Sequence, residues 1–222
     1  MPLAPNQCMR QTIYIIILSA LFSAIAIACP KPAQDVQEAL RLMKRFSHRE
    51  MKTDAAGKVW YLDISEQDAV TDDTLVAVRH LPHLREVYMI YCPIKGDGLA
   101  NLNHLKEIEK LDLYATRVDD RALKHVAQLR TLKYLDIRSI GTTDKGQFAN
   151  HHGHVSNDGI AMVADNLPNL ESLLFCGTVN DQGLRHLVRL KKLNHVEICS
   201  PNVTEDGINW LQMAMPNLKI DR

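Results

Sequence analysis

The sequence predicts a mixed α/β fold in which similar units stack along one axis. Two short patterns support this prediction, because they recur in step with each other through most of the 222 residues. The first is a loose L-x-x-L-x-L motif, which alternates apolar and other side chains as a short strand does. The second is an apolar residue followed by small polar and acidic residues, which is typical of a helix start. Each unit is therefore expected to be a strand, a turn and a helix.

An apolar segment with the features of an export signal precedes the repeats. Residues 13–28 contain no charged residue, Arg10 lies just before them, and the first acidic residue is Asp35. This order is typical of a secretory signal peptide, and the segment is shorter than the roughly 20 residues of a membrane-spanning helix. We therefore predict a signal peptide over residues 1–28 and an exported protein. An uncleaved membrane anchor is the alternative.

Cys29 follows this segment and allows two forms of processing. The small residues Ala26 and Ala28 suit cleavage by a signal peptidase. The same stretch resembles the bacterial lipoprotein box, in which the cysteine after a small residue carries a lipid. Simple cleavage and lipidation both stay open, so the predicted location is the periplasm, the cell envelope or the outside of the cell. Contact with the membrane is expected only through the signal anchor or a lipid on Cys29.

Residues 29–58 are predicted to form a tether and an N-terminal helical cap. Apolar residues recur at helical spacing between Gln34 and Arg49. They are Val36, Leu40, Met43 and Phe46. A stack of repeats needs a cap because its open end would otherwise expose the core. Residues 52–58 are interpreted as a turn into the first strand.

The strand motif occurs six times after residue 58. Its central apolar residues are about 24 positions apart, a period typical of repeat proteins. These residues are Leu62, Val87, Leu111, Leu135, Leu173 and Val196. The longer gap between Leu135 and Leu173 indicates that one repeat carries an insertion.

The second pattern marks a helix start in each of these repeats, which we number one to six. It begins at Val70, Ile94, Val118, Val155, Val179 and Val203. In five of the six, the next residue is Thr, Asp, Ser or Asn, which are preferred N-cap residues. One such unit cannot bury its own apolar face, whereas stacked units share a continuous core. We therefore expect a single repeat domain over residues 59–222.

The two patterns together resemble those of the leucine-rich repeat family over about residues 59–221. The period is similar to that of ribonuclease-inhibitor-like members, and the polar helix start, such as V-T-E-D-G-I from Val203, is similar to that of exported bacterial members. The resemblance implies a horseshoe-shaped solenoid with a parallel sheet on its concave side and helices on its convex side.

The strands predict a surface for binding a partner. Side chains alternate along a strand, so residues between the buried apolar positions point to the concave face. The candidate binding residues there are Tyr61, Asp63, Tyr88, Asp112, Tyr114, Tyr134, Asp136, Arg138 and Glu197. Tyrosine is common at binding hot spots, and acids stacked about 4.8 Å apart repel one another and so favour a cationic partner. The alternative is that tyrosine simply suits strands and that the acids keep an exposed sheet soluble.

The insertion covers about residues 140–154. It contains no leucine, and its Gly, Thr and Asp residues are typical of an exposed loop. His151, His152 and His154 are of the residue type that ligates zinc or copper. Their spacing matches no rigid metal-binding motif, so we favour a polar loop and predict neither a metal nor a cofactor.

Two cysteines occupy the same position in neighbouring repeats. Cys176 and Cys199 are expected to have Cα atoms about 5 Å apart, within range of a disulfide. In-register pairs on parallel strands often have unfavourable torsion angles, so the sequence leaves both the bonded and the free pair open. Cys92 is expected to face the interior as a small apolar residue.

Composition and motifs argue against several functions. The chain has 26 basic and 26 acidic residues, so it lacks the excess of Lys and Arg that nucleic-acid binding needs. No phosphate loop, nucleotide fingerprint or metalloprotease helix occurs, and nothing in the sequence indicates a catalytic triad. We predict a monomeric, non-enzymatic, exported leucine-rich repeat protein that binds a protein partner through its concave face.

Two other functions stay open. A structural envelope lipoprotein, tethered through Cys29, would have no specific ligand. A metal-binding or enzymatic protein would use His151, His152 and His154. Salt-sensitive capture of one partner would favour protein binding, whereas metal retained in stoichiometric amount would favour the histidine site.

Overall fold

The computed structural model describes residues 36–46, 50–138, 141–142, 148–149 and 155–222. The predicted signal peptide and Cys29 lie outside these residues, as do His151, His152 and His154. Within the described part of the chain, no helix is both long enough and apolar enough to cross a membrane.

The repeats share one eight-stranded sheet. Its strands are β1 Glu50–Thr53, β2 Val59–Asp63, β3 Glu86–Tyr88, β4 Lys110–Asp112, β5 Tyr134–Ile137, β8 Ser172–Cys176, β9 His195–Cys199 and β10 Lys219–Asp221. They lie side by side in that order. The strands from β2 to β10 are parallel, and β1 is antiparallel to β2.

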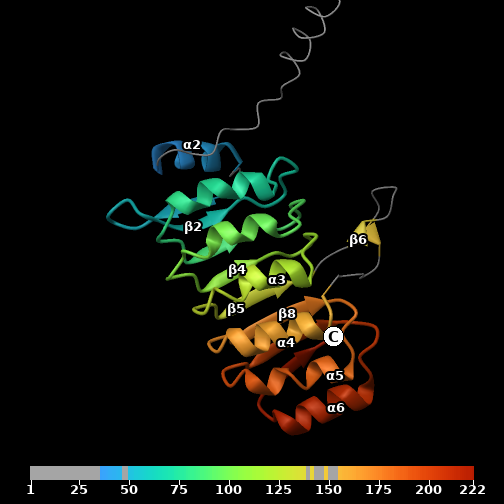
Figure 1. The fold of residues 1–222 in the computed structure, drawn as a ribbon. Coiled ribbons are helices and arrows are strands. Elements are labelled where there is room, and N and C mark those ends of the chain that lie inside the picture. The colour runs from blue at the N-terminus through green and yellow to red at the C-terminus, as the bar shows by residue number, and fades with distance from the viewer. Residues whose placement is uncertain (1–35, 47–49, 139–140, 143–147, 150–154) are drawn as a thin grey trace, which may run out of the picture. The chain divides into compact units, whose positions relative to one another are not determined.

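Helices connect the strands and cover one face of the sheet (Figure 1). The α-helices are α2 Val36–Phe46, α3 Asp120–Val126, α4 Asn157–Asn166, α5 Asp181–Leu184 and α6 Glu205–Ala214. The first and second repeats have the 3₁₀ helices η1 Asp72–His80 and η2 Asp97–Leu102 instead, and η3 Leu187–Arg189 follows α5 in the fifth. We call the opposite face of the sheet the concave face.

The predicted N-caps are confirmed at the four α-helices that follow strands. Their side chains accept backbone N–H groups from the first helical turn, which would otherwise have no partner. The capping residues are Asp119, Ser156, Asn180 and Thr204.

The core is a row of apolar side chains between the sheet and the helices. All six central strand residues, from Leu62 to Val196, are fully buried. In-register pairing of the strands places them next to one another. Full burial of one such side chain is worth about 1.5–3 kcal/mol. Ala39 and Met43 of α2 are also fully buried, so this helix packs against the same core.

The structure differs from the sequence-based prediction at two places. The first helix ends at Phe46, and Glu50–Thr53 forms β1, where a helix end and a turn are predicted. The insertion, predicted as a loop, contains β6 Gly141–Thr142 and β7 Phe148–Ala149. These two strands pair with each other in a separate antiparallel sheet.

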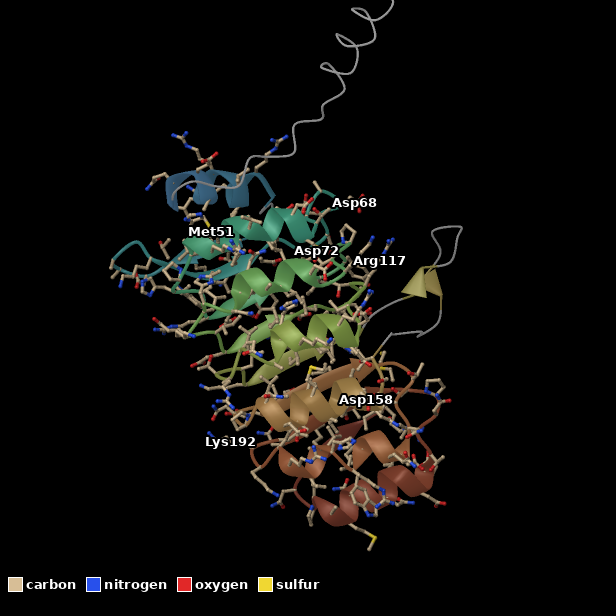
Figure 2. All side chains as sticks on the ribbon, viewed as in Figure 1. Met51, Asp68, Asp72, Arg117, Asp158 and Lys192 are labelled. Carbon is tan, nitrogen blue, oxygen red and sulfur yellow. The ribbon has the colours of Figure 1, made fainter. Side chains whose placement is uncertain are left out.

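A polar side chain joins each of several helix starts to the following repeat. Asp72 accepts backbone hydrogen bonds of 2.8–2.9 Å from the turn at Lys95–Gly98 of the next repeat (Figure 2). The residues that bind the next turn in the same way are Asp120, Asn157 and Asp181. We call these contacts the inter-repeat junctions.

The junctions leave no room for a Cβ atom in the facing turn. The facing residues are Gly98, Gly159, Gly183 and Gly207, and a Cβ on any of them would overlap the joining residue of the previous repeat. The junction between the second and third repeats has the opposite arrangement. Gly96 of the second repeat occupies the position of the joining residue, and Ala122 of the third repeat occupies the position of the facing glycine. A Cβ on Gly96 would overlap the Ala122 methyl group. At Gly159, Gly183 and Gly207 the overlap is with the joining side chain, whereas at Gly98 it is with the backbone of Asp72.

Candidate functional site

The in-register strands bring the predicted binding residues together on the concave face. The first column runs from Tyr61 on β2 through Glu86 and Lys110 to Tyr134 on β5. The second column contains Asp63, Tyr88, Asp112, Asp136, Leu174 and Glu197. Tyr114 and Arg138 lie two residues beyond the second column and so point to the same side. The nine predicted residues therefore lie on one side of the sheet.

Aromatic rings and cations alternate across the strands at the N-terminal end of this surface. The rings of Tyr61 and Tyr88 have centroids 5.2 Å apart. Lys110 lies between Tyr88 and Tyr134, with its Nζ 5.0 and 4.3 Å from the two ring centroids. Lys52 of β1 lies 4.5 Å from the Tyr61 centroid. A cation over an aromatic face is attracted to the ring, so these side chains favour one another's positions.

A second aromatic group lies just beyond the C-terminal ends of β3 and β4. The rings of Tyr91 and Tyr114 meet edge to face with centroids 5.5 Å apart. The guanidinium carbon of Arg138 is 4.8 Å from the Tyr114 centroid. Tyr91 is exposed and has a φ of 56°. The concave face therefore presents two neighbouring aromatic groups.

The acidic residues of the second column are predicted to be exposed, and this prediction is wrong for Asp112 and Asp136. Asp112 is 7% exposed and Asp136 is 1% exposed. Each accepts the backbone N–H two residues further along, from Tyr114 and Arg138 respectively, at 3.0 Å. Asp63 makes the same contact with the Ser65 N–H at 3.0 Å. These carboxylates hold the strand ends in turns instead of forming an open anionic surface.

Burial also changes the ionisation of these side chains. Burial, reinforced by the charge of Asp136, raises the pKa of Asp112 from 3.8 to about 6. Burial also raises the pKa of Asp136, against the opposing effect of Arg138. The pKa values of Tyr88 and Tyr134 lie above the ordinary value because burial disfavours the phenolate. Both tyrosines are therefore neutral at physiological pH.

Arg138 connects the two halves of the surface. Its Nε and Nη2 donate to Asp136 at 3.0 and 2.5 Å, and its Nη1 donates to Glu197 Oε1 at 2.5 Å. Burial alone would lower the pKa of Arg138, but the two carboxylates outweigh burial and hold it above its ordinary value. The contact reaches from β5 across β8 to β9, so it fixes side chains on both sides of β8.

A hydrogen-bonded series at the C-terminal end of the surface was not predicted. Ser172 Oγ and His195 Nδ1 are 3.0 Å apart, and His195 Nε2 is 2.8 Å from Asp221 Oδ2. Lys219 Nζ also donates to Asp221, at 2.6 Å. The aligned repeats do place Ser172 and His195 at neighbouring positions of the first column, and this is the signal that could have identified the pair. The series fixes the orientation of the imidazole.

A cavity of about 470 Å³ lies beside the aromatic residues, where β2, β3 and β4 begin. One wall is Trp60 of β2, and the other lining residues carry charges of both signs. Arg85 and His83 bind Glu107 at 3.0 and 3.2 Å. The hydrogen bonds from His83 and Arg85 lower the pKa of Glu107. No sequence motif marks this cavity, because its residues come from three different repeats.

Metal-ligating residue types are dispersed in the described part of the chain. No group of three His, Cys, Asp or Glu residues there is arranged to hold a metal ion. Cys176 and Cys199 are register partners, as expected, and both thiols are free. Cys92 is buried, as expected, and its thiol donates to the Ile64 carbonyl at 3.3 Å.

Comparisons with known proteins find similarity in three-dimensional structure. No protein-family model and no curated protein sequence matches the chain. Among solved structures, the LRR ectodomain of the receptor kinase SOBIR1 from Arabidopsis thaliana is 18% identical with a TM-score of 0.44. That match covers 84% of this chain and 96% of the SOBIR1 chain.

A second solved structure is the LRR ectodomain of the Arabidopsis receptor kinase HAESA in complex with an N-terminally extended IDA peptide hormone. It is 14% identical, with a TM-score of 0.53. The match covers 87% of this chain but 33% of the HAESA chain, so the chain spans a third of that ectodomain's length. At this level of identity the similarity is one of fold, and it agrees with the repeats and the sheet described above.

Proposed function

We propose that this chain, which has the leucine-rich repeat fold, is an exported, non-enzymatic protein that binds a protein or peptide on its concave face. The observation that carries the proposal is the row of aromatic rings and cations in contact from β1 to β5. Tyr61, Tyr88 and Tyr134 are partly exposed, and Lys52 and Lys110 pack against their rings. Side chains ordered before binding lose little conformational entropy when a partner arrives.

The peptide complex of the HAESA ectodomain supports a protein or peptide as the class of ligand. The predicted preference for a cationic partner loses much of its support, because Asp112 and Asp136 are buried and Arg138 pairs with Asp136 and Glu197. We therefore expect the aromatic rings to supply most of the binding energy. The charged residues are expected to affect the association rate and its salt dependence.

A displayed peptide library tests this proposal without a known partner. Peptides enriched on the wild-type protein are titrated against a Tyr88→Ala/Tyr114→Ala double variant. Each tyrosine is expected to contribute on the order of 2 kcal/mol of binding if it is a hot spot. Trp210→Ala is the matched control, because Trp210 is a partly exposed aromatic residue of α6 that also contacts an arginine, Arg185.

Two outcomes would contradict the proposal. Undiminished affinity of the double variant, with melting curves like those of the wild type, would place the binding site elsewhere on the molecule. Equal losses in the double variant and in Trp210→Ala would show that the effect is not specific to the concave face.

The export part of the proposal rests on the apolar segment before Cys29. Intact-mass analysis of the protein from its native host is expected to show that residues 1–28 have been removed. A diacylglycerol mass on Cys29 would identify a lipoprotein. Retention of residues 1–28 would exclude both forms of processing.

Hydrolysis is the second candidate function, because Ser172, His195 and Asp221 have the composition of a catalytic triad. Two features oppose it: the Asp221 side chain is 42% exposed, and the Lys219 ammonium neutralises its charge. We expect a fluorophosphonate probe to label the wild type and Ser172→Ala equally. Labelling that disappears in Ser172→Ala would establish the hydrolase.

A further inference from the structure

Two free thiols lie next to each other on the concave face. Cys176 ends β8, Cys199 ends β9, and the two are register partners. Neighbouring strands are about 4.8 Å apart, which is within the 4.4–6.8 Å between the Cα atoms of natural disulfides. The register therefore places the two Cα atoms at a separation that a disulfide can span.

The two thiols differ in accessibility and in proton affinity. Cys176 is 3% exposed, whereas Cys199 is only partly buried. A hydrogen bond between the two thiols raises the pKa of Cys176 and lowers that of Cys199. At Cys199, burial and the charge of Glu197, to which its thiol donates at 3.9 Å, oppose this lowering of the pKa, and the Arg138 guanidinium supports it. Cys199 is therefore the thiol that ionises first and that a reagent in solution can reach.

We propose that Cys176 and Cys199 form a thiol–disulfide exchange site that reacts with small disulfides such as oxidised glutathione. Cys199 loses its proton, and its sulfur attacks one sulfur of the reagent. The reagent's S–S bond breaks, and one glutathione thiolate leaves and takes up a proton. Cys199 is then joined to the second glutathione through a mixed disulfide.

Cys176 completes the exchange. It loses its proton and attacks the Cys199 sulfur, and the bond between Cys199 and glutathione breaks as the second glutathione leaves. The protein has then lost two electrons and two protons, and the reagent has gained both. The product is a disulfide that links β8 to β9 next to the contact between Arg138 and Glu197.

Cys92 provides a comparison within the same molecule. It is 1% exposed, and burial raises its pKa to about 11. The structure pairs its thiol with the backbone carbonyl of Ile64. A reaction that depends on the environment of Cys176 and Cys199 should therefore leave Cys92 reduced.

Equilibration with glutathione tests the proposal on the full chain. The protein is incubated at a series of ratios of oxidised to reduced glutathione, quenched with acid, alkylated and mapped by peptide mass spectrometry. We expect a Cys176–Cys199 disulfide to form and to disappear on reduction. Cys176→Ser is expected to trap the mixed disulfide on Cys199, Cys199→Ser to abolish both products, and Cys92→Ser to behave as the wild type does.

Three results would overturn the proposal. The first is a wild type in which Cys176 and Cys199 both stay reduced in fully oxidised glutathione. The second is a wild type that stops at the mixed disulfide of Cys199, which would show that Cys176 does not reach it. The third is modification of Cys92 at the same rate as Cys199. All three are read from the wild type, so they do not depend on whether the variants fold.

Discussion

At the scale of single residues, Asp112 and Asp136 mainly stabilise the turns that follow their own strands. Each accepts a backbone N–H at the end of its strand and is buried under neighbouring side chains. A carboxylate in such a place costs desolvation energy, which Arg138 offsets for Asp136 through a bidentate contact. Asp112 makes no such contact with an arginine among the described residues, and burial together with the charge of Asp136 raises its pKa.

Asp112→Asn is therefore expected to change the pH dependence of stability. The folded-state pKa of Asp112, about 6, lies above the ordinary value of 3.8, so the folded state binds more protons between these values. The contribution of Asp112 to stability should fall as pH rises from about 4 to about 6 and stay low above that. Between pH 4 and pH 7, the free energy of unfolding of the wild type should fall by on the order of 1–3 kcal/mol relative to that of Asp112→Asn.

Denaturant unfolding of both proteins at several pH values measures this difference directly. Asp63→Asn is the matched control, because Asp63 makes the same turn contact from a more exposed position on β2. A difference between the wild type and Asp112→Asn that stays constant from pH 4 to pH 7 would contradict the argument.

At the scale of the elements, the inter-repeat junctions fix how one helix start approaches the next. In the fifth repeat, Gly183 faces Asn157 of the fourth, and Asn157 Oδ1 accepts the Asn180 N–H at 3.0 Å. In the third repeat the roles are reversed, and Ala122 faces Gly96. A helix start therefore has glycine at this position where the joining residue of the previous repeat leaves no space for a Cβ atom.

Gly183→Ala is expected to destabilise the fold by about 1–3 kcal/mol, because its new methyl group would overlap Asn157. Adding Asn157→Gly removes the overlap with Asn157 and leaves the contact of the new methyl group with Val179 Cγ1. The double variant should therefore lose less stability than the sum of the two single variants. Thermal or denaturant unfolding of the four proteins gives the coupling energy, and strict additivity would show that the two positions do not compete for space.

At the scale of the whole molecule, the repeat period predicts most of the fold. The spacing from Leu62 to Val196 predicts the strand register and the buried row, because one unit repeats with little change. The sequence does not predict strand β1, because E-M-K-T lacks the alternating apolar pattern. This segment is a strand because it pairs with β2. The same holds for β6 and β7, which have no repeat to follow.

The candidate site is less predictable than the fold. Alternation along the strands predicts which residues share the concave face, but it gives no information on how their side chains cover one another. The burial of Asp112 and Asp136 depends on side chains from several strands, and so does the series from Ser172 to Asp221. These contacts join residues that are 23 or more positions apart, which is beyond the reach of a local pattern.

Deletion of residues 142–152 is expected to leave the main sheet folded. Strands β6 and β7 pair with each other and not with that sheet. Leu135→Ala should instead cost about 2–5 kcal/mol, because Leu135 is fully buried in the central row. Unfolding curves compare the two changes, and a larger loss from the deletion would show that the insertion supports the core.

The reversed junction also restricts how the array can change in length. A tandem copy of the fifth repeat would set Asp181 against a second Gly183, a position without a side chain. A tandem copy of the third repeat would set Asp120 against a second Ala122, whose methyl group occupies the space that the carboxylate needs. A duplicated repeat therefore fits the junction geometry where its acid meets a glycine, and it does not fit at the third repeat, where the acid would meet Ala122.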